Sequence, residues 1–271
     1  MFCFIHIEKA AGTTLHTIFL NNYWSYVQIQ PRLYWTNREE NALLPEEICS
    51  LKKILKFSQG FGGHTVRSYL GYEKILERKI DYITFLREPV KIYISHYNYQ
   101  KNVMKVDWSV DNFLAEESFS NFMTKRIAGG YDLKKAKEIL TKHFSFVGLT
   151  EFFDQSLLIM KYRLFSEDFD MFYQKRNVAR SYYSENFSKE RIQQIKKNNR
   201  LDIELYAYVK DILYKRYLDE YPGNLFKDIE DFKKSKAEYS YKKNIIHRFL
   251  SRGYDILFHY LQGNIHRKYH G

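Results

Sequence analysis

The stretch that decides the fold is FCFIHIEKAAGTTLHTIFL, residues 2–20. Residues 2–7 form a continuous run of apolar and β-forming side chains, which is typical of a strand buried on both faces of a parallel sheet. Residues 8–14 are mostly small or polar, and apolar residues with helical spacing follow over 15–20. The segment therefore predicts a strand, a small-residue loop and a helix, in that order.

The same alternation continues along the chain. We expect further strands at 26–29, at 57–64 running into a glycine-bearing loop, at 81–86 and at 144–149. We expect helices at 46–56, at 89–100, over 109–143 with an interruption at Gly129 and Gly130, from Thr150 as a cap to 164, and over 188–218 with a break near Asn198. This pattern predicts an α/β fold, a P-loop-like three-layer arrangement with a central, mostly parallel sheet flanked by helices.

The length allows one large domain with an appendage. The chain has 271 residues, of which 45% are hydrophobic and 28% charged, as is usual for a folded globular protein. We expect the main domain to span residues 1–221. Residues 222–271 are rich in Lys, Arg, Tyr, Phe and His and read as a helical C-terminal extension. Its alternatives are a docking element, a membrane-surface helix, an oligomer arm or a solvated helix packed on the core.

Charge and cysteine content narrow the partners and the compartment. The formal net charge of +11 and a pI near 9.3 favour anionic partners such as nucleotides, nucleic acid, acidic glycans or membrane surfaces. Two cysteines, Cys3 and Cys49, make no disulfide framework, and no Cys and His spacing of a metal site is present. Without a signal peptide or an apolar stretch of membrane-spanning length, we expect a cytoplasmic protein that could also touch a membrane surface.

The loop after the first strand has the composition of an anion cradle. A strand that feeds a small-residue loop and a helix N-terminus exposes backbone N–H groups, and the helix dipole favours negative charge there. Ala10, Ala11 and Gly12 allow close approach of a phosphate, and Lys9 adds a positive charge. Thr13 and Thr14 add hydroxyl donors. These are candidate binding residues for a phosphorylated ligand.

The spacing differs from that of a Walker A loop. In that loop the lysine follows the glycines and a Ser or Thr that binds magnesium follows the lysine. Here Lys9 precedes Gly12, and Ala10 stands at the position after the lysine. The sequence therefore disfavours phosphoryl transfer from Mg-ATP, although an ATP-dependent P-loop kinase stays as an alternative.

A second candidate motif is YITFLREPVKIYISHYNY, residues 82–99. Arg87 stands at the carboxyl end of an expected strand, and in an open α/β sheet that edge binds ligands. Pro89 suits the first turn of the following helix, and Ser95 lies about two turns into it. Arg87 can form a bidentate contact with a terminal phosphate, and Ser95 can donate from its hydroxyl.

A third candidate is GFGGHT, residues 60–65, which carries His64. A histidine on a loop after a strand suits proton abstraction, because the ordinary imidazole pKa lies near neutrality. His96 is a rival, but it follows Ser95 directly on a helix and so faces elsewhere. Glu88 is a further candidate base, and a purely structural role for His64 stays open.

The loop HIEKAAGTTL resembles the 5′-phosphosulfate loop of the PAPS-dependent sulfotransferases, and in particular their carbohydrate branch, which includes heparan sulfate 2-O-sulfotransferase-like and bacterial members. That branch often reads His-Ile-Pro-Lys-Thr-Gly-Gly-Thr-Thr, so Glu8 here replaces a proline and Ala10-Ala11 replaces Thr-Gly. Residues 82–99 resemble the 3′-phosphate motif of the same family. The resemblance covers about residues 2–215, and the extension after Pro222 matches nothing in it.

The resemblance implies the roles of the candidates. It implies a sulfotransferase that moves a sulfuryl group from the donor PAPS to a hydroxyl of a carbohydrate, with PAP as product and no metal. Lys9 and His64 would be catalytic. The donor would be bound by Lys9, Ala10, Ala11, Gly12, Thr13, Thr14, Arg87, Ser95, Arg176, Arg180 and Ser181. Some members have a second histidine near the base, which we do not expect here, and Arg126 is expected to be solvated.

Two readings compete with this one. The kinase reading predicts magnesium dependence and an Asp at a strand end, where this chain has Arg87. The other reading is a basic polyanion-binding protein without catalysis, which would bind nucleic acid or glycans in a strongly salt-dependent way. It leaves both phosphate motifs unexplained, so we expect a nucleotide donor and a carbohydrate acceptor as partners and no nucleic acid.

Overall fold

The computed structural model describes residues 1–29, 42–174, 187–238, 247, 249–254, 256–258 and 260. Within them lies a five-stranded sheet of β1 (Phe2–Ile5), β2 (Tyr26–Ile29), β3 (Gly60–Gly63), β4 (Asp81–Leu86) and β5 (Phe144–Leu149). The strand order is β2-β3-β1-β4-β5 and every pairing is parallel. The α/β class with a parallel sheet is therefore confirmed.

Helices connect the strands. In chain order they are α1 (Gly12–Asn22), α2 (Pro45–Leu55), α3 (Tyr72–Leu76), α4 (Pro89–Asn102), α5 (Val110–Ala115), α6 (Phe122–Ala128), α7 (Leu133–Lys142), α8 (Phe153–Leu164), α9 (Lys189–Asn198), α10 (Arg200–Tyr208), α11 (Lys215–Asp219) and α12 (Leu225–Glu238). A π-helical stretch, Val209–Tyr214, joins α10 to α11, and short 3₁₀ turns lie at Ser68–Leu70, Glu117–Phe119 and Thr150–Phe152.

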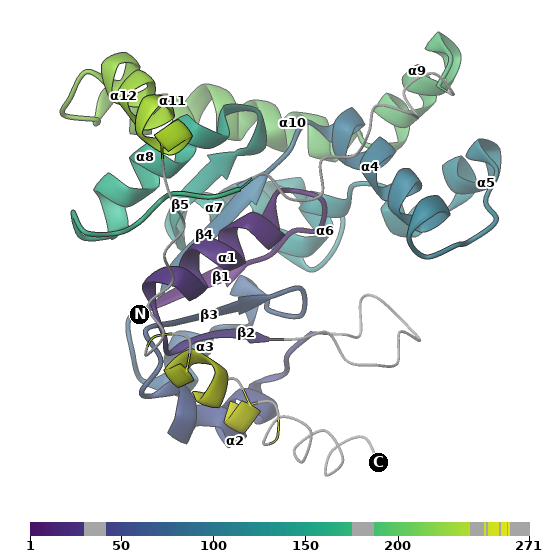
Figure 1. Cartoon of the computed structure of the whole chain (residues 1–271). Helices are drawn as coiled ribbons and strands as arrows, with labels where there is room; N and C mark the ends of the chain where they lie inside the picture. The colour runs from purple at the N-terminus through teal and green to yellow at the C-terminus, as the bar shows by residue number, and fades with distance from the viewer. Residues whose placement is uncertain are drawn as a thin grey trace.

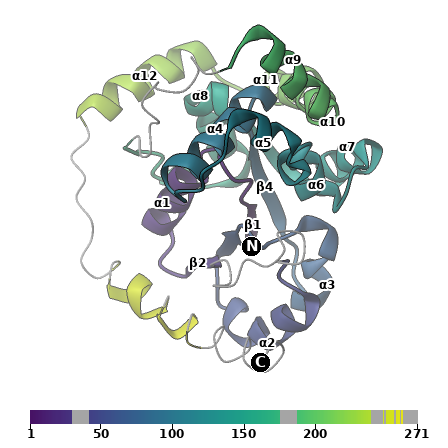
Figure 2. The ribbon, with the colours of Figure 1, turned by 90° about the vertical axis from the view of Figure 1, so that its right-hand side faces the viewer.

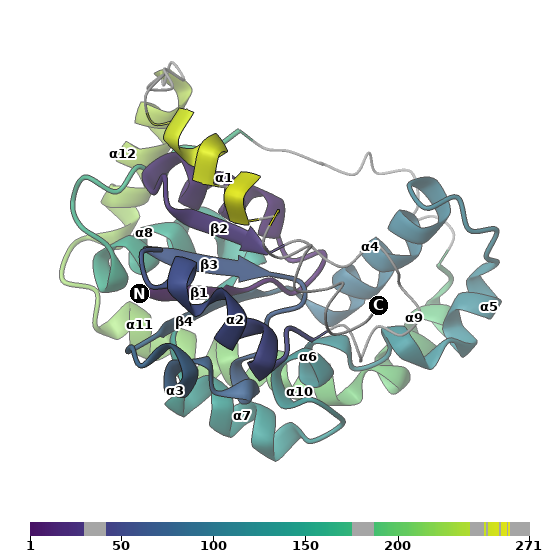
Figure 3. The same ribbon diagram turned by 90° about the horizontal axis from the view of Figure 1, so that it is seen from below.

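Helices cover both faces of the sheet. Figures 2 and 3 show α1, α8 and α12 on one side and α2, α3 and α7 on the other. Alternate residues of β1 account for this, because successive side chains of a strand point to opposite faces. The rings of Phe2 and Phe4 pack at an angle against Phe19 of α1, with ring centroids 4.8 and 5.6 Å apart. The three-layer arrangement expected from the sequence is thus present.

The glycines of residues 60–63 lie in β3 itself and not in a loop after it. The reason is space. A Cβ on Gly62 would stand 2.5 Å from the Phe4 carbonyl oxygen and 2.7 Å from the Tyr26 hydroxyl. The glycines therefore make room for large aromatic side chains of the neighbouring strands, and His64 follows directly after the strand.

The direction of the strand connections reverses between β1 and β4. From β1 the chain continues to β2, toward one end of the strand order. From β4 it continues to β5, toward the other end. Ligands of open α/β sheets bind outside the carboxyl ends of the strands at such a reversal. At this edge α4, α5 and α9 project beyond the sheet (Figure 1) around a second core that includes Tyr93, Phe113 and Ile195.

Helix boundaries follow the expected signals in most places. Asp132 and Ser188 cap α7 and α9 by accepting from Lys135 and Arg191 N–H groups. The break near Asn198 is present between α9 and α10. The cap expected at Thr150 is wrong, because the Thr150 hydroxyl donates to the Leu86 carbonyl at 2.9 Å and α8 begins at Phe153.

The C-terminal extension packs on the core. Phe232 of α12 is buried and stacks on Phe172, with ring centroids 5.5 Å apart. Lys236 pairs with Asp154 of α8 at 3.3 Å. The described residues from 247 to 260 are helical and lie beside α1 and α2 (Figure 3). Of the helices in the described part of the chain, none has the length and apolar character to cross a membrane.

Candidate functional site

The loop between β1 and α1 has an unusual backbone. Lys9 and Ala11 both have positive φ, at 67° and 63°. Non-glycine residues adopt this conformation at a cost, and such residues cluster where a ligand is held. In the described chain, the N–H groups of Lys9, Ala11, Gly12 and Thr13 donate to no recorded acceptor. Free N–H groups in a loop of this type, at a helix N-terminus, form an anion-binding concavity.

Arg87 joins the two phosphate motifs. It stands just beyond β4, and its Nη1 donates to the Lys9 carbonyl at 3.0 Å. Burial lowers the pKa of Arg87, which the carboxylates of Glu151 and Glu88 oppose. The Arg87 guanidinium therefore fixes the backbone of the anion loop through one hydrogen bond. It lies where β1 and β4 end.

Helix α4 closes the other side of the loop. The Lys9 ammonium lies 4.4 Å from the centroid of the Tyr99 ring. Ser95 is one turn before Tyr99 and so shares its helix face. Since Tyr99 contacts Lys9, that face is turned toward the loop. Ser95 therefore shares a helix face with the residue that contacts Lys9.

Glu8 points into the protein and pairs with Arg126. The Arg126 Nε donates to Glu8 Oε2 at 3.2 Å, and its Nη2 contacts Oε1. Burial opposes ionisation of Glu8, but the charges of Arg126, His64, Arg67 and His96 together outweigh it and lower the carboxyl pKa to about 2. The expectation of a solvated Arg126 is wrong, because α6 directs this side chain toward the loop and only 7% of it is exposed.

His64 lies beside this ion pair. Its Nδ1 is 3.8 Å from Glu8 Oε1 and is buried without a hydrogen bond in the described chain. Burial lowers the His64 pKa below its ordinary value, which the Glu8 carboxylate partly offsets. The ring is therefore neutral at neutral pH, with a carboxylate placed to stabilise the protonated form. About a quarter of the side chain, 26%, is accessible.

A second histidine is present after all. The His6 ring stacks on His64, with centroids 3.8 Å apart and planes at 32°. This corrects the expectation that the chain lacks such a residue. The sequence separates the two histidines, but parallel pairing of β1 with β3 sets Ile5 beside Gly63 and so brings the next residues of both strands together.

His6 is the end of a buried hydrogen-bonded chain. His6 Nδ1 and His16 Nε2 are 3.1 Å apart, and His16 Nδ1 is 2.8 Å from the Tyr26 hydroxyl. Burial lowers the pKa of His16 to about 3 and that of His6 well below its usual range, so both rings are neutral. Donation from the Tyr26 hydroxyl to His16 Nδ1 would let His16 Nε2 donate to His6 Nδ1 and would place the proton of His6 on Nε2.

The His6 ring also explains Gly12. A Cβ at Gly12 would stand 1.8 Å from His6 Nε2. Contact with the His6 ring therefore requires glycine here. The ring of His6 separates the anion loop from His64, so the candidate base stands one ring away from the phosphate cradle.

The loop after His64 holds polar atoms without partners. The Arg67 side chain is buried, and its Nη1 donates to the carbonyls of His64 and Val66 at 2.5 and 2.9 Å. Its Nη2, with Thr65 Oγ1 and Ser68 Oγ, has no hydrogen bond among the described residues. Burial lowers the Arg67 pKa to about 10. Arg67 was missed by the sequence reasoning, and only its position three residues after His64 could have indicated it.

His96 lies near enough to the loop to contribute to lowering the Glu8 pKa, so the expectation that it faces elsewhere is not confirmed. It is buried against Phe122 of α6, with ring centroids 4.6 Å apart. Glu88 also has another role, since its carboxylate caps α4 by accepting from the N–H groups of Val90 and Lys91. Neither side chain competes with His64 for the exposed part of the site. Arg176, Arg180 and Ser181 lie outside the described residues.

Comparison with known proteins adds no assignment. A scan against protein-family models and a search of curated proteins both find no match. The described residues contain no group of three or more His, Cys, Asp or Glu placed to hold a metal ion.

Proposed function

We propose that the chain is a sulfotransferase that moves a sulfuryl group from PAPS to a carbohydrate hydroxyl. The observation that carries the proposal is the arrangement around His6, whose ring lies between Gly12 of the anion loop and the ring of His64. This arrangement puts the His64 imidazole, which would activate the acceptor hydroxyl, close to the anion loop. Arg87 lies at the same edge of the sheet, where open α/β folds bind ligands.

The donor would occupy the anion loop and the edge of the sheet where β1 and β4 end. PAPS carries a 5′-phosphosulfate and a 3′-phosphate, which are both anionic. The free N–H groups from Lys9 to Thr13 would hold the 5′-phosphate, with hydroxyls of Thr13 and Thr14 nearby. Arg87 and Ser95 would bind the 3′-phosphate, because they flank the loop from β4 and α4.

Transfer would proceed by in-line attack on sulfur. The acceptor oxygen forms a bond to sulfur as the bond from sulfur to the bridging phosphate oxygen breaks, and PAP leaves. His64 takes the hydroxyl proton. Since Nδ1 faces Glu8, we assign this step to Nε2. Lys9 offsets the charge that grows on the bridging oxygen.

Glu8 would support the base. Once His64 holds a proton, it becomes a cation 3.8 Å from the Glu8 carboxylate. That carboxylate is ionised and held in place by Arg126. Its role resembles that of a carboxylate that orients and stabilises a catalytic imidazolium. This gives a physical reason for the residue that departs from the family pattern.

The test is transfer of label from radiolabelled PAPS to a panel of glycans, with His64→Ala and His143→Ala compared. A general base contributes about 10²- to 10⁴-fold in rate. We expect His64→Ala to lose that much while PAP binding, measured by calorimetry, stays within a few fold. His143 is exposed at the end of α7 and serves as the matched control, with unchanged turnover. Weaker PAP binding with unchanged turnover in His64→Ala would reject the base assignment.

A further inference from the structure

The helical residues from 247 to 260 contact the body through one face. His247 Nε2 is 2.7 Å from the Leu20 carbonyl of α1, and the Tyr254 hydroxyl donates to the Ile54 carbonyl of α2 at 2.8 Å. Phe258 is fully buried. Leu20 and Ile54 lie near the ends of their helices, so this contact is made at the amino edge of the sheet, opposite the anion loop.

A different face of the same residues is apolar and exposed. Phe249, Ile256 and Tyr260 are 79%, 61% and 67% exposed. At 3.6 residues per turn they fall within about 40° of one another. Leu250 and Leu257 extend the face and are also exposed. A surface helix of a globular protein normally presents polar side chains on its outer side, so this face indicates an interaction site.

The centre of this outer face is open. Gly253 lies between the apolar positions on the helix, and a Cβ built on it would meet no atom within 4 Å. We call the face formed by Phe249, Leu250, Ile256, Leu257 and Tyr260 the outer apolar face. No described part of the chain covers its centre.

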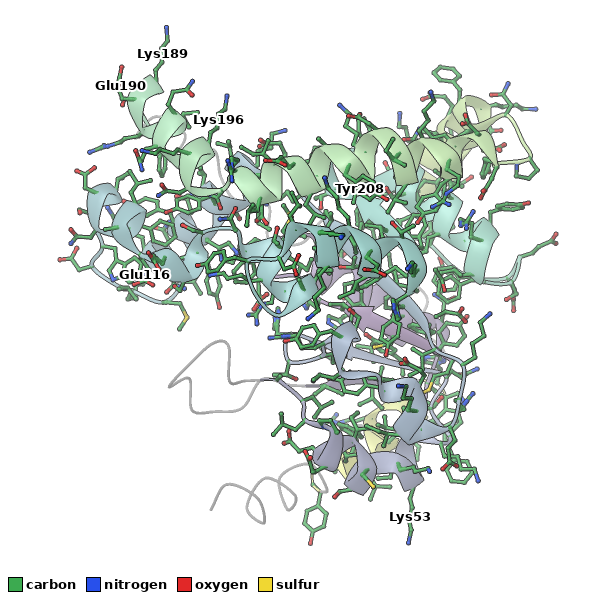
Figure 4. The ribbon with its side chains drawn as sticks, turned by 180° about the vertical axis from the view of Figure 1, so that it is seen from behind. Lys53, Glu116, Lys189, Glu190, Lys196 and Tyr208 are labelled. Atoms are coloured by element: carbon green, nitrogen blue, oxygen red, sulfur yellow. The ribbon has the colours of Figure 1, made fainter. Side chains whose placement is uncertain are left out.

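The sequence that carries the outer apolar face is basic. Residues 239–271 contain six Lys or Arg and a single acidic residue, Asp255. Arg252 is exposed on the helix itself. On the adjoining α2, Lys53 and Lys56 are exposed, and Figure 4 shows Lys53 pointing away from the body at this end of the molecule. Phe57, next to Lys56, is 73% exposed and adds an aromatic side chain.

The positive charge of the chain indicates which kind of partner binds the outer apolar face. A second copy of the chain would bring two basic surfaces together, and the whole chain carries a net charge of +11. Exposed Phe, Leu, Ile and Tyr with flanking Lys and Arg are the pattern of helices that lie in a membrane interface and bind anionic lipid headgroups. We propose that the outer apolar face docks on an anionic membrane surface, independently of the proposed transfer reaction.

This docking would leave the candidate site open. The helical residues from 247 to 260 are anchored near the amino ends of the strands, through the Leu20 and Ile54 carbonyls, while Lys9, Arg87 and His64 all follow carboxyl ends of strands. Membrane contact would therefore not cover the anion loop. The protein would be held at the surface without being inserted across it.

The test is co-sedimentation of the full chain with vesicles of phosphatidylcholine alone and of phosphatidylcholine mixed with phosphatidylglycerol. The variant Phe249→Ser/Ile256→Ser removes two exposed apolar side chains. Phe226→Ser is the matched control, because Phe226 is 77% exposed on α12, away from this face. Circular dichroism confirms that both variants fold.

We expect binding to the mixed vesicles that falls with salt, because the headgroup contacts are electrostatic. The double variant should lose at least about tenfold in partition coefficient, since it removes two side chains that would enter the interface. Phe226→Ser should bind as the native chain does. Equal binding by the double variant, no binding by the native chain, or binding that is the same for both vesicle types would overturn the proposal. So would a dimer, seen by light scattering, that the double variant dissociates.

Discussion

At the scale of single residues, the contacts between side chains of the candidate site indicate what each of them does. Glu8 reads in the sequence as a charge of unknown direction, and Arg126 as a surface residue. The structure pairs them and places His64 Nδ1 3.8 Å from the same carboxylate. The Glu8–Arg126 contact joins residues 118 positions apart, so composition and local spacing could not predict it.

The Glu8 carboxylate should make the free energy of unfolding depend on pH in the acid range. Its pKa falls from an ordinary 4.5 to about 2 in the folded chain. A depressed carboxyl pKa stabilises the fold above the unfolded value and loses that contribution as pH falls through the folded value. We expect a contribution of about 3 kcal/mol at neutral pH, lost between pH 4.5 and about 2.

The measurement is urea unfolding of the native chain, Glu8→Gln and Glu46→Gln across this pH range. Glu46 is an exposed carboxylate of α2 and is the matched control. The free energy of unfolding of Glu8→Gln should lie well below that of the native chain at neutral pH, because Arg126 then lacks its partner. The gap should narrow toward pH 2. A gap that is constant over this range would contradict the ionised pair.

At the scale of elements, the strands and most helices were predictable because each has a local pattern. β1, β4 and β5 are short apolar runs, and α2, α4 and α7 carry helical spacing or a recognisable cap. The strand order was not predictable, since it depends on contacts between distant segments. That is why His6 was missed as a neighbour of His64. Their approach follows from the β1–β3 pairing alone.

The junction of β1 and α1 predicts a coupling between Gly12 and His6. Gly12→Ala places a methyl group against the His6 ring, where the Cβ would stand 1.8 Å from Nε2. We expect Gly12→Ala to destabilise the native chain by about 1–3 kcal/mol, as overpacking does. In a His6→Ala background the same change should cost less, because the ring is gone.

A double-mutant cycle on thermal or urea unfolding measures this coupling. Residues in direct contact show interaction energies of about 0.5–3 kcal/mol. Additive effects of Gly12→Ala and His6→Ala would mean that the ring does not pack on the glycine. The same variants also report on the donor site, since a displaced His6 should disturb PAP binding.

In the whole molecule, the two motifs proposed to bind phosphate meet where β1 and β4 end. Arg87 Nη1 and the Lys9 carbonyl are 3.0 Å apart, although the residues are 78 positions apart. The sequence predicted that both would lie at the carboxyl edge, because parallel strands end there together. It could not predict the direct contact, which depends on β1 and β4 being neighbours.

The extension should be part of the stable fold. Phe232 and Phe258 are buried, and Lys236 lies over the Tyr173 ring at 3.4 Å from its centroid. A chain ending at residue 221 would expose the surface that these residues cover. We expect it to melt several degrees lower by circular dichroism, since each large buried side chain contributes about 1.5–3 kcal/mol. An unchanged melting temperature would show that residues 222–271 form an independent appendage.

The central claim is that the loop and Arg87 form a site for a 3′-phosphorylated nucleotide. The most direct measurement is calorimetric titration of PAP, with ATP as the control and no added metal, into the native chain and Arg87→Ala. We expect tight binding of PAP to the native chain and weak binding of ATP. PAP should bind at least about tenfold more weakly to Arg87→Ala, because a charge-assisted phosphate contact contributes about 1.5–3 kcal/mol. Absence of PAP binding by the folded chain, or magnesium-dependent binding of ATP in its place, would contradict it.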